Sequence, residues 1–477
     1  MKILFVASEC TPIAKVGGLG DVIGALPKAL TELGLDIRIV IPKYRIIDEN
    51  KYHFERIASK IKVKEEFINI YQGFLPDSKV PVYLLENEKY FGENGVYLAK
   101  SAFVDSFKEI QRFLFFSQAI PEIFKSLDWK PEIIHCQDWH TAILPVLVKL
   151  NPKSEISNLK SVLTIHNLAN QGKWLASEVL SFLNLKGNEA ESLKIIDEEG
   201  KISIFEQGIL NADILNTVSQ NYAQEIRTKE FGEGLEQDLI KRQNNLFGII
   251  NGIDYDRFNP ETDPDISRNY SLKSLEKRTE NKIDLQKTLK LPENQQLPLL
   301  GIINRLTSQK GVDLVIEIIP ELIKLNCQLV VLGVGEDIYE KKLLEFSLKY
   351  PSNISCQIKF DPVLAQKIYA GSDVFLMPSK FEPCGLGQMI AMRYGAIPIV
   401  RKTGGLAETV KNKKTGFVFE DYKKDALLKS LKECLDAYSN RDKWVELMKR
   451  AMNQDFSWQK SAKRYVELYK NLTSSKP

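Results

Sequence analysis

The chain has 477 residues, of which 44% are hydrophobic and 27% charged, and its 65 basic and 62 acidic side chains leave a formal net charge of +3. This length favours two or more domains, and so balanced a charge gives no reason to expect a nucleic-acid partner. No apolar run approaches the roughly 18 residues that a membrane span needs, so no membrane association is expected either.

The six cysteines, at positions 10, 136, 327, 356, 384 and 434, form no CxxC pair and no spacing typical of a metal site. They are expected to be reduced thiols. The apolar residues 1–8 are followed by a glycine-rich stretch that is not a signal-peptide cleavage site. These features indicate a cytoplasmic protein.

Short apolar runs rich in β-branched residues alternate with helical patterns along the chain. The expected strands of the first half are 2–8, 37–42, 80–86, 132–137, 161–166 and 214–219, and the expected helices are 21–33, 108–125 and 139–150. The alternation restarts after residue 251, with strands at 298–305, 328–335, 374–379, 397–400 and 416–420 and a helix from 311. Near-continuous apolar runs are typical of parallel strands covered on both faces. The predicted fold class is therefore α/β, with two doubly wound, Rossmann-like domains.

Asn-Gly and Asn-Pro pairs interrupt this pattern within 248–260 and place the join between the domains there. We expect an N-terminal domain over 1–248, a C-terminal domain over 249–455 and a terminal segment over 456–477. Ligands of open α/β sheets bind at the carboxyl ends of the strands. Two such domains predict an interdomain cleft that receives strand-end loops from both.

The stretch KVGGLGDV (15–22) follows the first expected strand and opens a helix, so its backbone N–H groups could face an anion. It is not a dinucleotide-binding GxGxxG fingerprint, because the last glycine is replaced by Ile23, and it lacks the Gly-Lys-Ser/Thr of a Walker A loop. From these residues alone, an anion-binding loop and a tight strand-to-helix turn are equally acceptable.

Charged residues mark strand ends in the second half as well. Arg305 ends a strand and Lys310 precedes the next helix, which fits a diphosphate clamp, although two solvated surface cations would give the same pattern. Glu382 follows another strand and either accepts a hydrogen bond from a ligand hydroxyl or caps a helix. Thr403 and Gly404 open a further segment with N–H donors.

Three of the four histidines fall at two expected strand ends, in HCQDWHT (135–141) and TIHNL (164–168), together with Asp138. A lone histidine is more often structural than catalytic, but this grouping favours a functional site. No HExxH motif and no cysteine spacing supports a metal, so no metal is expected.

The ordered set of motifs resembles the bacterial glycogen synthase and plant starch synthase family, glycosyltransferase family 5, which has the GT-B fold. Each motif is weak alone, whereas the set in this order along the whole chain is specific. The resemblance is carried by KVGGLGDV (15–22), DWHT (138–141), TIHNLANQG (164–172), NGID (251–254), RLTSQKG (305–311), SKFEPCGLGQ (379–388), TGGLAETV (403–410) and FSWQKSAKRYVELY (456–469).

The resemblance implies a retaining transfer of glucose from ADP-glucose to the non-reducing 4-hydroxyl of an α-1,4-glucan such as glycogen or a maltooligosaccharide, without cofactor or metal. It also implies that the C-terminal helix within 456–477 returns to the first domain. The implied catalytic residues are Asp138, His166, Arg305, Lys310 and Glu382; the donor-binding residues are Lys15, Gly17, Gly18, Asn251, Cys384, Gly385, Leu386, Thr403 and Gly404; and the acceptor-side residues are Asp21 and His140.

The chain departs from the family pattern at Gly387, Asn170 and Glu206, where threonine, an aromatic residue and lysine are usual, and ahead of Arg112, where Tyr-x-Asp-Asn is usual. Two alternatives therefore stay open: a GT-B enzyme that uses another nucleotide sugar, and a catalytically silent glucan-binding homologue. The choice of ADP over UDP rests on the resemblance. No carboxylate is obviously dedicated as a nucleophile, which favours same-face substitution over a glycosyl-enzyme.

Overall fold

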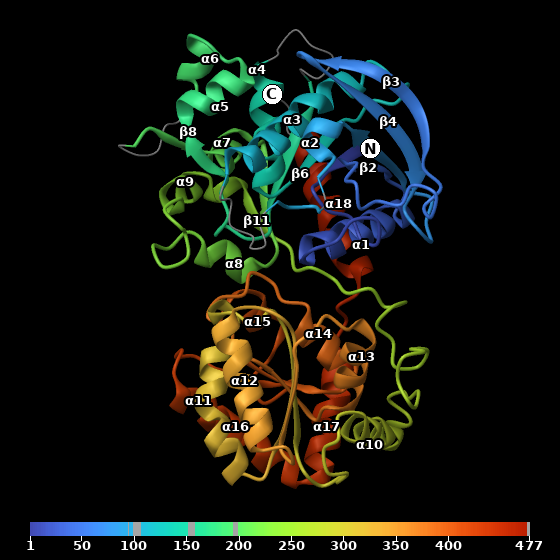
Figure 1. Cartoon of the computed structure of the whole chain (residues 1–477), viewed down its shortest axis with the longest axis vertical. Helices are drawn as coiled ribbons and strands as arrows, with labels where there is room; N and C mark the ends of the chain where they lie inside the picture. The colour runs from blue at the N-terminus through green and yellow to red at the C-terminus, as the bar shows by residue number, and fades with distance from the viewer. Residues whose placement is uncertain (94, 99–105, 151–157, 194–198, 475–477) are drawn as a thin grey trace. The chain divides into compact units, whose positions relative to one another are not determined.

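The computed structural model describes residues 1–93, 95–98, 106–150, 158–193 and 199–474 and divides the chain into two compact units (Figure 1). Unit 1 comprises Met1–Gly252 together with the C-terminal residues from Trp458, and unit 2 comprises Ile253–Ser457. The first join lies inside the stretch 248–260 that the sequence marks. Among the described residues, no helix has both the length and the apolar character that crossing a membrane requires.

Unit 1 is built on a nine-stranded mixed sheet with the order β11-β10-β7-β6-β1-β2-β5-β4-β3. The seven parallel strands are β1 (Lys2–Val6), β2 (Asp36–Pro42), β5 (Pro81–Glu86), β6 (Ile133–Gln137), β7 (Lys160–Ile165), β10 (Ile214–Thr217) and β11 (Leu246–Gly248). An antiparallel hairpin, β3 (Glu55–Val63) and β4 (Glu66–Phe74), extends one edge. A separate small ribbon pairs β8 (Lys173–Leu175) with β9 (Lys201–Ser203).

The helices of unit 1 connect these strands. They are α1 (Gly18–Glu32), α2 (Glu88–Phe91), α3 (Phe107–Ile123), α4 (Leu144–Leu150), α5 (Ala176–Leu183), α6 (Asn188–Glu191), α7 (Ile204–Asn211), α8 (Gln220–Glu225), α9 (Glu236–Lys241) and α18 (Trp458–Ser474), with 3-10 turns at Trp139–Thr141 and Gln243–Asn245. The expected helix 139–150 is wrong in its first turn. Proline costs least in the first turn of an α-helix, where its missing N–H would have no acceptor, and Pro145 fits a helix that begins at Leu144.

The C-terminal helix α18 belongs to unit 1 and packs against α1. Its buried face, which includes Trp458, Ala462 and Leu468, joins the apolar core under the sheet. Tyr469 Oη lies 2.8 Å from His135 Nδ1 on β6, so a fully buried hydrogen bond also ties this helix to the sheet.

Unit 2 contains a six-stranded, all-parallel sheet with the order β14-β13-β12-β15-β16-β17. Its strands are β12 (Leu299–Ile303), β13 (Gln328–Leu332), β14 (Ile354–Gln357), β15 (Val374–Met377), β16 (Ile397–Arg401) and β17 (Phe417–Phe419). Its helices are α10 (Arg278–Thr288), α11 (Val312–Lys324), α12 (Asp337–Lys349), α13 (Pro362–Gly371), α14 (Gly387–Arg393), α15 (Gly404–Thr409), α16 (Lys424–Ser439) and α17 (Arg441–Met452), with 3-10 turns at Leu275–Lys277 and Ser308–Lys310.

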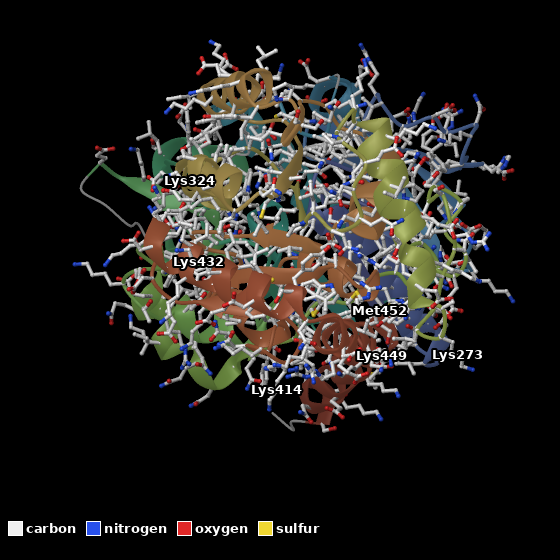
Figure 2. All side chains as sticks on the ribbon, turned by 90° about the horizontal axis from the view of Figure 1, so that it is seen from below. Lys273, Lys324, Lys414, Lys432, Lys449 and Met452 are labelled. Carbon is white, nitrogen blue, oxygen red and sulfur yellow. The ribbon has the colours of Figure 1, made fainter. Side chains whose placement is uncertain are left out.

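Helices cover both faces of this sheet. Figure 1 shows α11, α12 and α16 on one side of the strands and α10, α13 and α17 on the other. With apolar residues buried on both faces, the strands read as continuous hydrophobic runs, as in β13, which is buried throughout. Long side chains extend outward in Figure 2. Of the residues labelled there, Lys324, Lys414 and Lys432 are exposed and Met452 is buried.

Candidate active site

The site residues expected in unit 1 follow the ends of three neighbouring parallel strands. The glycine-rich loop follows β1, Asp138 and His140 follow β6, and His166 follows β7. Because β7, β6 and β1 are adjacent in the sheet, their carboxyl ends bring these loops to one edge. Asn251 follows β11 at the end of the same sheet.

The glycine-rich loop and the first turn of α1 are joined by an ion pair. Lys15 Nζ lies 2.6 Å from Asp21 Oδ1, and both side chains are about one-third exposed. Asp21 stands in the first turn of α1, where the helix dipole favours a carboxylate. Gly18 begins that helix, so its N–H is one of the amides for which the helix supplies no acceptor. The structure thus brings Lys15 and Asp21 together.

The Gly17 amide faces a carboxylate of the protein itself. Glu9 is buried, and its Oε2 accepts hydrogen bonds from the backbone N–H of Val16 at 2.6 Å and of Gly17 at 2.7 Å. The hydroxyl of Tyr97 donates to Glu9 Oε1 at 2.7 Å. In this structure the Gly17 N–H is thus engaged by a side chain of the protein, and its contact with a donor stays a prediction.

Asp138 has an unusual backbone conformation, with φ 59° and ψ −174°. Such strain is costly for a residue with a side chain and is concentrated at functional sites. Asp138 Oδ1 accepts hydrogen bonds from the backbone N–H of His166 at 2.9 Å and of Asn167 at 3.4 Å. Burial raises the pKa of Asp138 to about 7, against these two hydrogen bonds, which lower it. The carboxylate therefore fixes the loop that carries His166.

The three histidines differ in their surroundings. His166 Nε2 lies 2.8 Å from Gln137 Oε1, so the ring donates there, and burial lowers the His166 pKa well below its usual range. His140 lies among aromatic rings, with the ring centroids of Tyr97 at 5.2 Å and Phe113 at 4.6 Å, and its buried Nδ1 has no hydrogen-bond partner among the described residues. His135 is a structural group that joins β6 to α18 and β7.

In unit 2, the expected cation and the expected carboxylate form one ion pair. Lys310 Nζ lies 2.9 Å from Glu382 Oε1 and 2.7 Å from Glu382 Oε2, and Ser379 Oγ donates to Oε2 at 3.0 Å. The loops that carry them are joined a second time, since the backbone N–H of Lys380 donates to the Gln309 carbonyl at 2.8 Å. Both loops lie at the carboxyl edge of the sheet, after β12 and β15.

Arg305 stands apart from this pair. Its side chain is exposed and makes no ion pair or hydrogen bond with the part of the chain that the structure describes. Beside it, the buried Asn304 Oδ1 and Thr307 Oγ1 also find no partner among the described residues. An uncommitted guanidinium, in a loop that also carries unsatisfied polar atoms, is suited to a polar, anionic ligand.

The remaining donor residues lie in two tightly packed loops. Cys384, Gly385 and Leu386 connect β15 to α14, and Gly385 has φ 76°. Thr403 precedes α15, and a side chain on Gly404 would overlap the Glu382 carbonyl. The Gly405 N–H donates to that carbonyl at 3.2 Å. Backbone contacts thus hold the 403–405 segment against Glu382, and only glycine fits this approach.

Comparison with known proteins decides the family. Residues 2–241, half of the chain, match the family model described as the starch synthase catalytic domain. The chain belongs to the glycogen and starch synthase family. Residues 286–450 match the model described as glycosyl transferases group 1. Glycogen synthases of Thermosipho melanesiensis and Geotalea daltonii are each 43% identical to this family member, over all of both chains.

Comparison with solved structures supports the same family and fold. The catalytic domain of starch synthase IV from Arabidopsis thaliana, bound to ADP and acarbose, is 34% identical, with a TM-score of 0.89 and 99% of each chain covered. Sucrose-phosphate synthase from Thermosynechococcus elongatus, 15% identical with a TM-score of 0.62 over all of both chains, shares the fold. The predicted α/β GT-B fold, the resemblance to this family and the assignment as a glycosyltransferase are confirmed.

The structure accounts for most departures of this synthase-family chain from the usual motifs. A Cβ on Gly387 would lie 3.2 Å from Met377 Sδ, so Met377 occupies part of the space that a larger residue at this position would need. Glu206 is buried in the first turn of α7, where a carboxylate suits the helix dipole. Ahead of Arg112, a buried ion pair with Glu109 at 2.9 Å takes the place of the usual pattern. Nothing in the structure explains Asn170.

The sequence motifs did not predict several residues around the synthase site. Glu9, Tyr97, Gln137 and Ser379 support site residues through contacts that no local pattern announces. Phe360, 82% exposed in the loop after β14, stands at the same sheet edge as Arg305. The strand ahead of it, β14, was not predicted either, so the sequence offered no signal for Phe360. No group of three or more potential metal-binding His, Cys, Asp or Glu side chains occurs within the described residues.

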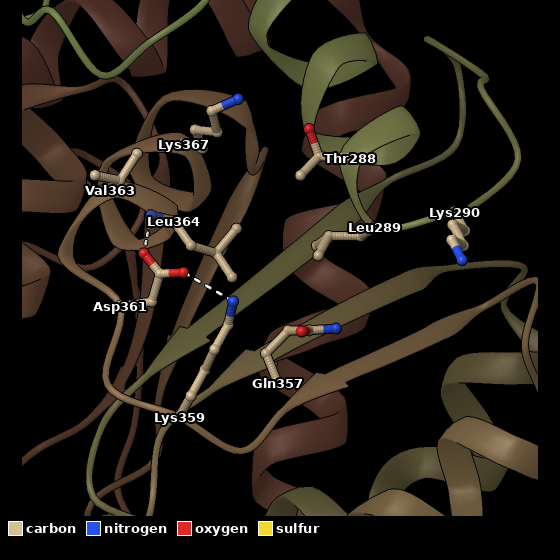
Figure 3. A pocket seen from close by; sticks show the side chains of 9 residues that line it. All are labelled: Thr288, Leu289, Lys290, Gln357, Lys359, Asp361, Val363, Leu364 and Lys367. Carbon is tan, nitrogen blue, oxygen red and sulfur yellow. Dashed lines mark hydrogen bonds and ion pairs between the residues drawn. The ribbon is translucent and has the colours of Figure 1, made fainter.

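A cavity of about 460 Å³ in unit 2 is separate from these residues. Figure 3 shows it beside α10 and α13, with Lys359 directed at Asp361. Asp361 is committed to the Leu364 N–H and to Lys359 at 2.8 Å, and Lys367 pairs with Asp284. None of the expected site residues lines this cavity, so it is not the candidate active site.

Proposed function

We propose that this protein transfers glucose from ADP-glucose to the non-reducing 4-hydroxyl of an α-1,4-glucan, with retention at the anomeric carbon and without a metal or cofactor. The observation that carries the proposal is the Lys310–Glu382 pair, together with an uncommitted Arg305 after the same strand as Lys310. The starch synthase IV structure, 34% identical and bound to ADP and acarbose, supports a donor and an acceptor of these classes. The six free, buried cysteines fit a cytoplasmic enzyme.

The proposed donor site uses unit 2. Arg305 forks across the diphosphate oxygens and Lys310 supplies a point charge, so that negative charge on the departing ADP is stabilised. Lys310 and Ser379 make three hydrogen bonds to the Glu382 carboxylate, which has about four acceptor positions, so Glu382 can still accept a hydrogen bond from a sugar hydroxyl. Cys384, Gly385, Leu386, Thr403 and Gly404 supply the backbone around it, and the exposed Phe360 ring offers a stacking surface for the base.

Unit 1 supplies the remaining groups in this proposal. Lys15 and the Gly18 amide contact the donor, while Asp21 and His140 serve the acceptor. His166 and Asn251, whose buried Oδ1 has no partner among the described residues, bind the sugar's hydroxymethyl group. Asp138 acts through the His166 backbone rather than on the substrate itself.

The proposed chemistry is a same-face substitution. The bond between the anomeric carbon and the phosphate oxygen breaks, and its electron pair leaves with ADP. The acceptor 4-oxygen forms the new bond from the same face and passes its proton to the leaving phosphate. Glu382 is committed to Lys310 and Ser379 and is not placed as a free nucleophile. A trapped covalent glucosyl adduct on any side chain would overturn this route.

The decisive experiment measures nucleotide release with ADP-glucose and with UDP-glucose, each with and without glycogen. Glycogen-dependent release of ADP and elongation of the glucan are the expected results. Faster turnover of UDP-glucose would replace the donor in the proposal. Turnover of neither donor, with glycogen still bound, would favour a catalytically silent glucan-binding protein.

A further inference from the structure

The glycine-rich loop is held from inside by a carboxylate that no substrate-binding motif includes. Glu9 is 2% exposed, and its two oxygens together receive three hydrogen bonds, from the Val16 and Gly17 amides and the Tyr97 hydroxyl. A buried carboxylate is stable only when such donors compensate its lost hydration. Two amides of the loop, those of Val16 and Gly17, are thus engaged by a side chain of the protein, whereas the Gly18 amide is not bound by Glu9.

The space for this carboxylate is provided by Gly20. A Cβ at Gly20 would lie 3.1 Å from Glu9 Oε2 and 3.2 Å from Thr11 Oγ1, closer than side chains normally approach. The third glycine of the loop therefore makes room for Glu9. The need for glycine at position 20 is thus explained by packing and does not require a ligand.

Tyr97 extends the contact into the rest of unit 1. Its hydroxyl lies between Glu9 Oε1 at 2.7 Å and Ser8 Oγ at 3.0 Å, and its ring stacks on His140. The segment that carries Tyr97 is fixed to α3, since Arg112 donates to the Val96 carbonyl and Glu109 accepts from the Leu98 N–H. A continuous path of contacts thus runs from α3 through Tyr97 and Glu9 to the loop of Lys15.

We propose that Glu9 is a positioning residue: with Tyr97 it forms a brace that holds the Val16–Gly17 backbone, and hence Lys15, in the geometry needed for glucosyl transfer. This inference rests on the proposed function for its kinetic readout. Glu9 touches no substrate. What the brace requires of Glu9 is hydrogen-bond acceptance, so an amide of the same shape can largely replace the carboxylate.

The test compares Glu9→Gln with Glu9→Leu. The glutamine carbonyl can still accept from both loop amides, and its NH2 can donate to the Tyr97 oxygen, so kcat should stay within about 3-fold of the wild-type value. Leucine has similar bulk and no acceptor, and the misplaced loop should lower kcat by about 10²-fold while the KM for ADP-glucose changes by less than about 3-fold. If Glu9 acted as a base or nucleophile, both variants would lose activity equally, and the proposal would be overturned. Wild-type kcat in Glu9→Leu would overturn it as well.

A matched pair of tyrosine variants keeps the test decisive if Glu9→Leu does not fold. Tyr97→Phe removes the hydroxyl that braces Glu9, and we expect kcat to fall by about 10-fold. Tyr44→Phe removes another hydroxyl, one that is buried and donates to the neighbouring Ser8 carbonyl at 2.9 Å, and should leave kcat within about 2-fold. Equal kcat values in these two variants would contradict the brace.

Two further measurements separate positioning from general destabilisation. Because Glu9 acts through the loop of Lys15, Glu9→Leu combined with Lys15→Ala should be no more than about 3-fold slower than Lys15→Ala alone, whereas independent effects would multiply. Hydrogen exchange of the Val16 and Gly17 amides should accelerate in Glu9→Leu and not in Glu9→Gln. If the wild-type protein turned over no nucleotide sugar, the proposed function would fail, and hydrogen exchange would still decide whether Glu9 holds the loop; unchanged exchange would refute the brace.

Discussion

Lys310 and Glu382 form a bidentate ion pair, with Nζ 2.9 Å and 2.7 Å from the two carboxylate oxygens, across two loops of the unit 2 sheet. Glu382 is only 6% exposed. A cation paired so closely is held in place before any ligand arrives. Such preorganisation avoids reorganisation cost when charge develops on a leaving group.

Replacing either clamp cation should therefore affect turnover strongly. Arg305→Ala and Lys310→Ala should each lower kcat by about 10²- to 10³-fold, because loss of one charge-stabilising donor has effects of this size. The measurement is steady-state ADP release with glycogen as acceptor, with circular dichroism to check the fold. Glu382→Ala should lower kcat at least as much as it raises the KM for ADP-glucose, because a group that positions the reacting sugar acts in the transition state.

Lys367→Ala is the matched control for this prediction. Lys367 pairs with Asp284 at 2.9 Å in the same unit and lies outside the clamp. Its loss should leave kcat within about 2-fold, since partly exposed ion pairs contribute little. Near-normal kcat in both Arg305→Ala and Lys310→Ala would refute their assignment to the diphosphate.

The strands that the sequence predicted share one property. β6, β7, β12 and β13 are buried on both faces, and burial leaves continuous apolar runs. The hairpin β3–β4 was missed because β3 is exposed along most of its length and shifts register at two places, so neither an apolar run nor a clean alternation marks it. Edge strands of this kind gain their order from pairing, which a local pattern does not encode.

For the candidate site, motifs predicted which residues matter and not which atoms they face. Lys310 and Glu382 lie 72 positions apart, and the strand order that joins them is a property of the whole sheet. The sequence did not predict a role for Glu9, because its burial against the Gly17 amide depends on tertiary packing. The strained backbone of Asp138 likewise has no signature in its neighbours.

His135 predicts a pH-dependent stability of unit 1. Burial lowers the pKa of His135 to about 3, whereas an unfolded histidine titrates near 6.5. Between these values the unfolded chain binds a proton that the folded chain does not, so stability falls as pH decreases through this window. His135→Gln should reduce the slope of unfolding free energy against pH at pH 4.5–6 by about 1.4 kcal/mol per pH unit.

Urea unfolding of both proteins at several pH values measures this slope. His53, an exposed histidine, provides the variant His53→Gln, with which the slope of His135→Gln is compared. The buried His140 and the partly buried His166 keep contributing in both variants, so part of the acid sensitivity remains. An unchanged slope in His135→Gln would show that this ring is protonated in the folded protein.

In unit 2, replacement of Lys282 should have a large effect on stability alone. Its Nζ is buried and donates to Asp373 Oδ2 at 2.7 Å, to the Gln295 and Leu297 carbonyls and to the Tyr438 hydroxyl. Lys282→Met would leave the Asp373 carboxylate with the Leu299 N–H at 2.9 Å and with Arg278, at the longer distance of 3.9 Å, as its cation. Removing one partner of a buried pair costs about 3–5 kcal/mol, which denaturant unfolding measures.

The control is Lys449→Met, which removes a surface ion pair with Glu446. Its free energy of unfolding should change by less than about 1 kcal/mol. The paired loss of Lys282 and Asp373, as Lys282→Met with Asp373→Leu, should restore part of the stability, because the buried carboxylate that Lys282→Met deprives of its close cation is then absent. A Lys282→Met protein as stable as the wild type would mean that Asp373 gains another partner.

Asp138 predicts the pH dependence of activity. Burial raises its pKa to about 7, so the carboxyl group takes up a proton as pH falls through 7. The ionised form is the stronger acceptor for the His166 and Asn167 amides. Activity should therefore decline below about pH 7, and kcat/KM measured from pH 5.5 to 9 should show this acidic limb. Histidines with strongly lowered pKa values do not titrate in this range.

Two variants test whether Asp138 causes the acidic limb of the kcat/KM profile. Asp138→Asn should be slower at every pH and should lack the limb, because an amide does not ionise. Glu9 is one of the charges that raise the Asp138 pKa, so Glu9→Gln should move the limb to lower pH while largely preserving kcat. The stability effect has the opposite sign to that of His135: the folded state binds the Asp138 proton more tightly than the unfolded state, so its contribution is present at acid pH and is lost as pH rises from about 4 to 7. A limb that persists unchanged in Asp138→Asn would assign the titration to another group.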